Sequence, residues 1–203
     1  MEEQIRVPSD SITLAGLFDR GVTPDSENGV VVTHPHPLYG GDMYNPVVET
    51  IVQTYHAKGW ATLRFNFRGV GTSGGHYDDG VGEQDDVVAA VDYMRQAGIK
   101  RIDLAGYSFG AWVCAQCASA LDTINCMIMV SPPVAMMGFA GVGAIPRLAM
   151  VVTGSEDEIA PPEMIQKHLA TWNPETRFAV IDGADHFFMG WQRVLQQSLE
   201  SVV

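Results

Sequence analysis

The feature that most constrains this chain of 203 residues is a serine between two glycines, Gly106-Tyr107-Ser108-Phe109-Gly110. Residues 101–105 before it are short and apolar, as in a buried strand, and residues 111–121 after it favour a helix. A sharp strand-to-helix turn forces the serine into strained backbone dihedrals and exposes its hydroxyl. Because the glycines lack a Cβ, the strand and helix backbones can crowd this turn. The pattern fits a nucleophile or an ordinary glycine-serine turn, and the remaining sequence has to distinguish them.

Alternating elements surround this turn. Residues 4–19 read as two alternating strands joined by a tight turn, so a hairpin is expected at the start. The apolar runs that favour buried strands are 29–33, 59–67, 125–131, 148–154 and 176–182, and the segments that favour helices are 45–58, 83–97, 161–172 and 190–203. Such alternation predicts an α/β fold with a mostly parallel sheet covered by helices on both faces.

Length and charge narrow the class of protein. A chain of this length with 46% hydrophobic residues predicts one domain, residues 1–203. The net charge of −12 argues against nucleic acid and anionic membranes as partners, because both require clustered Lys and Arg. No apolar run approaches the roughly 20 residues of a spanning helix, and the start of the chain is acidic where a signal peptide would be basic. A cytoplasmic location is therefore expected.

The three cysteines, Cys114, Cys117 and Cys126, predict buried thiols. A metal site needs further ligands at matching spacing, and a redox Cys-x-x-Cys lies at the start of a helix rather than two turns inside it. Neither a metal nor a cofactor is expected. The glycine-rich segment 68–75 lacks the Lys of a phosphate-binding P-loop and the glycine spacing of a dinucleotide fold, so it predicts a connecting loop near the site.

A stiff loop, His34-Pro35-His36-Pro37-Leu38-Tyr39-Gly40-Gly41, follows the strand at 29–33. His34 and His36 are candidate bases or metal ligands, but their spacing across prolines, with no Cys or Glu nearby in the sequence, favours a structural role. A histidine side chain here can brace the loop through hydrogen bonds to the backbone.

With the serine turn inside an alternating chain, the sequence resembles the α/β-hydrolase superfamily, whose catalytic partners follow in the order serine, acid, histidine. Gly154-Ser155-Glu156-Asp157-Glu158 looks like the acid loop of that superfamily, which implies Asp157 as the acid, with Glu156 and Glu158 as competitors. His186 follows the last predicted strand, where similar enzymes carry the base. The resemblance therefore implies a catalytic triad of Ser108, Asp157 and His186.

The resemblance also implies an oxyanion hole made of two backbone N–H groups. One belongs to the residue after the nucleophile, which is Phe109, and the other to the loop after an early strand, where we expect Leu38. The His-Gly that usually precedes the second donor reads His36-Pro37 here, and Tyr39 or a later residue is the alternative donor.

A finer resemblance rests on the loop at 34–41, on Arg-Phe-Asn-Phe-Arg-Gly-Val-Gly-x-Ser and on Gly-Glu-x-x-Asp. Together these motifs are similar to small bacterial hydrolases without a cap, near the dienelactone-hydrolase-like and carboxylesterase branches. Dienelactone hydrolases proper use a cysteine nucleophile and the dehalogenase-like branch an aspartate, so Ser108 departs from both. The resemblance covers nearly the whole chain and implies mechanism better than substrate.

The interval 132–147, where many relatives insert a cap, is too short for a cap domain, so an open cleft is expected. Its expected walls are apolar residues near the catalytic positions: Leu38, Tyr39, Phe109, Pro133, Met136, Met137, Phe187 and Phe188. The sequence predicts a serine hydrolase whose small-molecule substrates are small or medium carboxylic esters. Acyl transfer or perhydrolysis on the same triad, and a non-catalytic binding protein with the hydrolase fold, remain alternatives.

Overall fold

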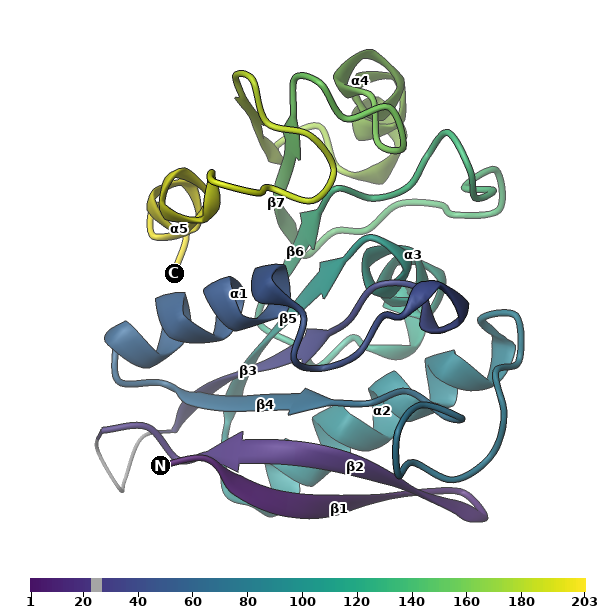
Figure 1. The fold of residues 1–203 in the computed structure, drawn as a ribbon, viewed down its shortest axis with the longest axis vertical. Helices are drawn as coiled ribbons and strands as arrows, with labels where there is room; N and C mark the ends of the chain where they lie inside the picture. The colour runs from purple at the N-terminus through teal and green to yellow at the C-terminus, as the bar shows by residue number, and fades with distance from the viewer. Residues whose placement is uncertain (23–26) are drawn as a thin grey trace.

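The computed structural model describes residues 1–22 and 27–203, which form an eight-stranded sheet in the order β1-β2-β4-β3-β5-β6-β7-β8 (Figure 1). The first two strands form the expected hairpin, β2 pairs antiparallel with β4, and the other pairs are parallel. The strands are β1 Glu3–Ser9, β2 Ile12–Asp19, β3 Asn28–Thr33, β4 Ala61–Phe65, β5 Arg101–Tyr107, β6 Met127–Val130, β7 Leu148–Gly154 and β8 Arg177–Ile181.

Helices cover both faces of this sheet. They are α1 Pro46–Ala57, α2 Val81–Gln96, α3 Phe109–Gln116, α4 Pro162–Trp172 and α5 Gln192–Leu199. Buried side chains of α1 and α5 share one core cluster, and those of α2, α3 and α4 share the other. Successive side chains of a strand point to opposite faces of the sheet. In β3, Val31 therefore packs in the cluster with α2, α3 and α4, and Val32 packs in the cluster with α1 and α5. The predicted α/β architecture is confirmed.

One boundary differs from the sequence prediction. The helix expected over residues 111–121 begins at Phe109, ends at Gln116 and is followed by a short 3₁₀ turn, Ala118–Ala120. This tighter turn brings Leu121 into the core, where its side chain is buried. Burial of an apolar side chain therefore decides where the helix ends, which local propensity does not reveal.

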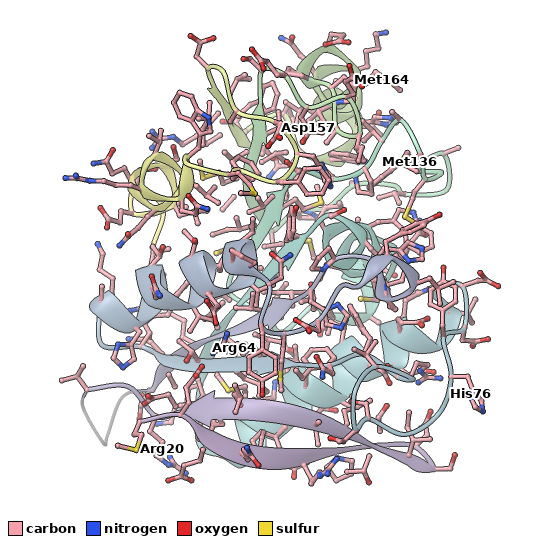
Figure 2. The ribbon with its side chains drawn as sticks, viewed as in Figure 1. Arg20, Arg64, His76, Met136, Asp157 and Met164 are labelled. Atoms are coloured by element: carbon pink, nitrogen blue, oxygen red, sulfur yellow. The ribbon has the colours of Figure 1, made fainter. Side chains whose placement is uncertain are left out.

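Arg64 on β4 ties the start of the chain to the sheet (Figure 2). Its buried guanidinium donates to both carboxylate oxygens of Glu2, at 2.9 and 2.7 Å, and to the Met43 carbonyl oxygen at 3.0 Å. A buried charge is tolerated when it is paired and hydrogen-bonded in this way.

The segment between β6 and β7 contains no helix over residues 132–147, in agreement with the expected absence of a cap. Over residues 1–22 and 27–203, no helix is long and apolar enough to cross a membrane.

Candidate active site

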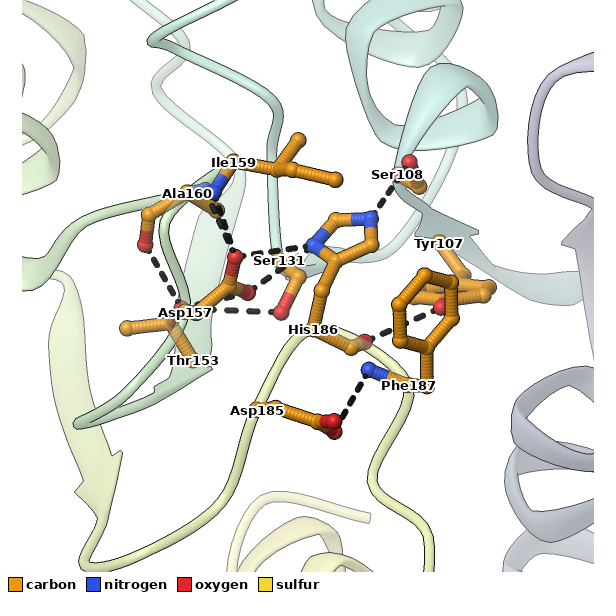
Figure 3. A network of polar contacts seen from close by, with 10 residues as sticks. All are labelled: Tyr107, Ser108, Ser131, Thr153, Asp157, Ile159, Ala160, Asp185, His186 and Phe187. Atoms are coloured by element: carbon orange, nitrogen blue, oxygen red, sulfur yellow. Dashed lines mark hydrogen bonds and ion pairs between the residues drawn. The ribbon is translucent and has the colours of Figure 1, made fainter.

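The candidate site lies at the carboxyl end of the parallel strands, where the segments after β5, β7 and β8 meet (Figure 3). Ser108 occupies the junction between β5 and α3 with φ 54° and ψ −119°, a strained conformation for a residue with a side chain. A Cβ on Gly110 would lie 2.8 Å from the His34 carbonyl oxygen, and one on Gly106 would lie 2.6 Å from the Ala111 Cα. Both glycines are therefore required for the close packing of the turn, as the sequence predicts.

The three residues expected to form the triad are within hydrogen-bond distance. Ser108 Oγ lies 2.9 Å from His186 Nε2, and His186 Nδ1 lies 2.9 Å from each carboxylate oxygen of Asp157. A carboxylate only accepts, so Nδ1 carries the proton and Nε2 is left as an acceptor for the serine hydroxyl. The arrangement can remove a proton from Ser108. The three residues are 7%, 6% and 2% exposed in the order Ser108, His186, Asp157, so bulk water does not screen their interactions.

Asp157 is held by a dense set of donors. Its Oδ1 accepts from the backbone N–H groups of Ile159 at 3.0 Å and Ala160 at 2.7 Å. Burial opposes ionisation, but the hydrogen bonds from His186, Ser131 and the Ala160 backbone outweigh it and hold the pKa of Asp157 below its ordinary value. The competing acids Glu156 and Glu158 are exposed on the same loop. Geometry thus selects Asp157 as the acid that faces His186.

The loop after β8, which carries His186, is held in place by Tyr107, the residue before Ser108. Tyr107 donates its hydroxyl to the His186 carbonyl oxygen at 3.0 Å, and the Phe187 N–H donates to Asp185 Oδ1 at 3.0 Å. The next residue, Phe188, has φ 53° and is fully buried in the core cluster shared with α1 and α5. The expectation that Phe188 lines the cleft is wrong, because the turn at this residue directs its ring into the core while Phe187 stays at the site.

His34 braces the loop after β3. Its Nε2 accepts from the Phe67 N–H at 3.0 Å, so Nδ1 carries the proton and donates to the Pro35 carbonyl oxygen at 2.6 Å. Complete burial lowers the pKa of His34 to about 4. His34 is therefore a neutral structural residue that joins the loop to the segment after β4, which is the bracing role that the sequence favours.

His36 turns back onto its own loop. Its Nδ1 accepts from the Leu38 N–H at 3.2 Å, so Nε2 carries the proton and faces the Tyr77 hydroxyl at 3.2 Å. Burial lowers the pKa of His36, which favours the neutral ring that this pairing requires.

This pairing corrects the expected oxyanion donor. The Leu38 N–H is already used by His36, and the Leu38 side chain is 67% exposed and outside the cavity that contains Ser108. The alternative Tyr39 N–H donates to the His36 carbonyl oxygen at 3.1 Å. Within the described part of the chain, the backbone N–H groups of Phe109 and His36 have no partner, and both residues line the cavity. The sequence prediction took His36-Pro37 as the counterpart of the usual His-Gly, which made the next residue, Leu38, the donor. The free N–H belongs instead to His36, the residue that follows His34-Pro35.

A cavity of about 330 Å³ opens over Ser108. The expected wall residues Tyr39, Phe109, Pro133, Met136, Met137 and Phe187 line it. The lining residues that sequence reasoning missed are Pro35, His36, Gly40, Gly41, Asn45, Tyr107 and Ile159. Neither Lys nor Arg occurs among the described residues of the lining, so the cavity offers no cation to pair with a charged ligand.

No cysteine is among the described residues that line the cavity, and Cys126 is half-buried rather than buried as the sequence predicts. Cys114 and Cys117 are buried free thiols, and burial raises the pKa of Cys114 to about 12. Across residues 1–22 and 27–203, no group of three or more His, Cys, Asp or Glu side chains is placed to hold a metal ion.

The chain is similar in sequence to known proteins. The sequence model described as "Alpha/beta hydrolase family" matches residues 30–151. An uncharacterized protein of Rickettsia prowazekii (strain Madrid E) is 33% identical over 185 residues, which cover 86% of this chain and 77% of that protein.

Two solved structures are similar over nearly the whole chain. One is an alpha-beta serine hydrolase homologue from Coxiella burnetii, with a TM-score of 0.90, 34% identity, and coverage of 98% of this chain and 96% of that chain. The other, from Xanthomonas campestris, is described as a serine hydrolase without a lid, with a TM-score of 0.89, 31% identity, and coverage of 98% and 92%.

Proposed function

Because this chain belongs to the α/β hydrolase family, we propose that it cleaves a small or medium carboxylic ester through an acyl-enzyme formed on Ser108. The observation that carries the proposal is the continuous chain from Ser108 Oγ through His186 to Asp157, at the base of an accessible cavity. A serine hydroxyl is a poor nucleophile at neutral pH, and a neutral imidazole acceptor at 2.9 Å supplies the base that it needs.

In the first half of the reaction, Ser108 Oγ attacks the ester carbonyl carbon while its proton passes to His186 Nε2. Asp157 stabilises the resulting imidazolium without taking its proton. The tetrahedral intermediate then expels the alcohol, which receives the proton from His186. In the second half, water attacks the acyl-enzyme by the same route and releases the carboxylic acid.

The negative oxygen of each tetrahedral intermediate needs two donors. The unpartnered N–H groups of Phe109 and His36 support these two residues as the oxyanion hole, in place of Phe109 and Leu38. The Phe109 N–H also lies at the N-terminus of α3, where the helix dipole favours negative charge.

The lining of the cavity restricts the acyl group. Methionine, proline and aromatic side chains provide apolar contact, and the described lining contains no Lys, Arg, Asp or Glu. A carboxylate on the acyl chain would lose its hydration without gaining a partner. The cavity therefore suits an uncharged acyl chain of moderate size.

Covalent labelling with a fluorophosphonate tests the proposal. The wild-type protein should be labelled once, Ser108→Ala should not be labelled, and Ser119→Ala, which removes an exposed hydroxyl, should behave as the wild type. Equal labelling of Ser108→Ala, or no labelling of folded wild-type protein alongside a reactive esterase, would rule out Ser108 as the nucleophile.

A further inference from the structure

Tyr77 follows the glycine-rich segment 68–75, in the connection between β4 and α2. Its hydroxyl oxygen lies 3.2 Å from His36 Nε2. Its ring packs against the rings of His36 and Phe109, with centroid separations of 5.1 and 5.9 Å. A connection for which the sequence predicts no chemistry therefore touches both residues whose backbone N–H groups are free at the candidate oxyanion hole.

The hydrogen bond between Tyr77 and His36 has a fixed direction. The Leu38 N–H donates to His36 Nδ1 at 3.2 Å, so in the neutral ring the proton is on Nε2. Nε2 therefore donates and the Tyr77 oxygen accepts. Because each ring nitrogen of His36 has its own partner, the ring is held in one tautomer and one orientation.

This bond joins the loop that carries His36 to the rest of the protein. The other hydrogen bonds of residues 36–41 stay within the loop: Leu38 N–H to His36 Nδ1, Tyr39 N–H and Gly41 N–H to the His36 carbonyl oxygen, and Gly40 N–H to the Pro37 carbonyl oxygen. Within the part of the chain that the structure describes, only the bond to Tyr77 connects residues 36–41 to another segment by a hydrogen bond. The position of the His36 backbone therefore depends on Tyr77.

Tyr77 is itself held from both sides. After it, the buried carboxylate of Glu83 on α2 accepts from the Asp78 N–H at 3.0 Å and the Gly80 N–H at 2.9 Å. Before it, Gly69 packs so closely that an added Cβ would lie 2.9 Å from the Tyr77 nitrogen. The connection is thus a firm support for the Tyr77 ring.

We propose that Tyr77 is a positioning residue that holds the His36 ring, and through it the His36 N–H, in the oxyanion hole, an inference that rests on the proposed function. Tyr77 is not among the described residues that line the cavity, so it acts through His36. An oxyanion donor stabilises the transition state only when it is aimed at the developing charge, and a small displacement weakens this stabilisation.

Tyr77→Phe keeps the aromatic ring and removes the acceptor for His36 Nε2. We expect kcat to fall about tenfold with KM little changed, because the oxyanion donor acts mainly on the transition state. The matched control is Tyr93→Phe, which alters another half-buried tyrosine, on α2 and outside the cavity, and should keep the wild-type values. Wild-type kcat in Tyr77→Phe would overturn the inference.

The same substitution in a His36→Ala background tests whether Tyr77 acts through the His36 ring. With no ring to hold, Tyr77→Phe should lower kcat by less than about twofold in this background. Urea denaturation establishes that each variant is folded at the assay temperature. An equal loss of kcat in the two backgrounds would overturn the inference, since Tyr77 would then act independently of His36.

The ring ¹⁵N signals of His36 provide a readout that needs no substrate. They are identified by their absence from His36→Ala and recorded at about pH 8, where the ring is neutral. We expect a protonated Nε2 and an unprotonated Nδ1 in the wild type, with the two shifts moving towards each other in Tyr77→Phe as both tautomers become populated. Identical shifts in the two proteins would overturn the inference. A protein that cleaves no ester but shows this change would refute the proposed function alone.

Discussion

The hydroxyl of Tyr107 donates to the backbone carbonyl oxygen of His186 at 3.0 Å, so the residue next to the nucleophile holds the loop that carries the base. The two residues are 79 positions apart in the sequence, and the bond is buried. It fixes the distance between the two halves of the site independently of the bond between Ser108 and His186.

Tyr107→Phe should destabilise the protein and slow catalysis. Leaving the buried His186 carbonyl without a partner costs about 1–3 kcal/mol of unfolding free energy, and a looser histidine loop should lower kcat about tenfold. Urea denaturation and ester hydrolysis measure the two effects. Tyr93→Phe on α2, outside the site, is the control and should change kcat little. Unchanged kcat in Tyr107→Phe would mean that the bond does not position His186.

His36→Pro tests the revised oxyanion donor. The φ of His36 is −58°, which proline adopts without strain, so this variant removes the N–H with little change of the backbone. His36→Ala removes the same side chain but keeps the N–H. We expect kcat of His36→Pro to lie about 10²- to 10³-fold below that of His36→Ala. Equal kcat values in two folded variants would exclude the His36 N–H as a donor.

His34 should make the protein sensitive to mild acid. The pKa of His34 falls from 6.5 to about 4 on folding, so the unfolded chain binds a proton first as the pH is lowered. Stability is complete above about pH 6.5 and declines down to about pH 4, by about 3 kcal/mol in total. Urea denaturation across this range measures the decline. His34→Gln should be less stable at neutral pH but should lack this part of the decline, and an unchanged slope in it would contradict the assignment.

An ester with a charged acyl chain should be a poor substrate. We compare 4-nitrophenyl butyrate with the mono-4-nitrophenyl ester of succinic acid, which share a leaving group and a chain length. Because the cavity lacks a cation and the protein carries a net charge of −12, kcat/KM should be at least about tenfold higher for the butyrate. Salt should narrow the difference by screening the longer-range repulsion. A preference for the succinate would refute the predicted selectivity.

Gly110→Ala should disrupt the turn at Ser108. The added Cβ would meet the His34 carbonyl oxygen at 2.8 Å, and neither backbone segment can yield easily. A loss of about 3 kcal/mol in unfolding free energy is expected, with a loss of fluorophosphonate labelling. In Gly138→Ala no atom lies within 4 Å of the new Cβ, so a change of about 0.5 kcal/mol or less is expected. Similar stability of the two variants would contradict the close packing.

The sequence determines most of this architecture because its signals are local. The apolar runs and the periodic segments identify each strand and helix, and the glycines around Ser108 identify the turn. The order of Ser108, Asp157 and His186, read with the family resemblance, places these residues after strands whose carboxyl ends share one edge of the sheet. Their convergence follows from that topology.

The tertiary structure decides which groups are available for chemistry. Whether the N–H of Leu38 or of His36 is free depends on where the His36 ring turns, and whether Phe187 or Phe188 faces the cavity depends on one left-handed residue. The hydroxyls of Ser131 and Thr153 lie 3.5 Å apart only because β6 and β7 are neighbours in the sheet. Hydrogen bonds and burial join residues that are distant in the sequence, so no local pattern specifies them.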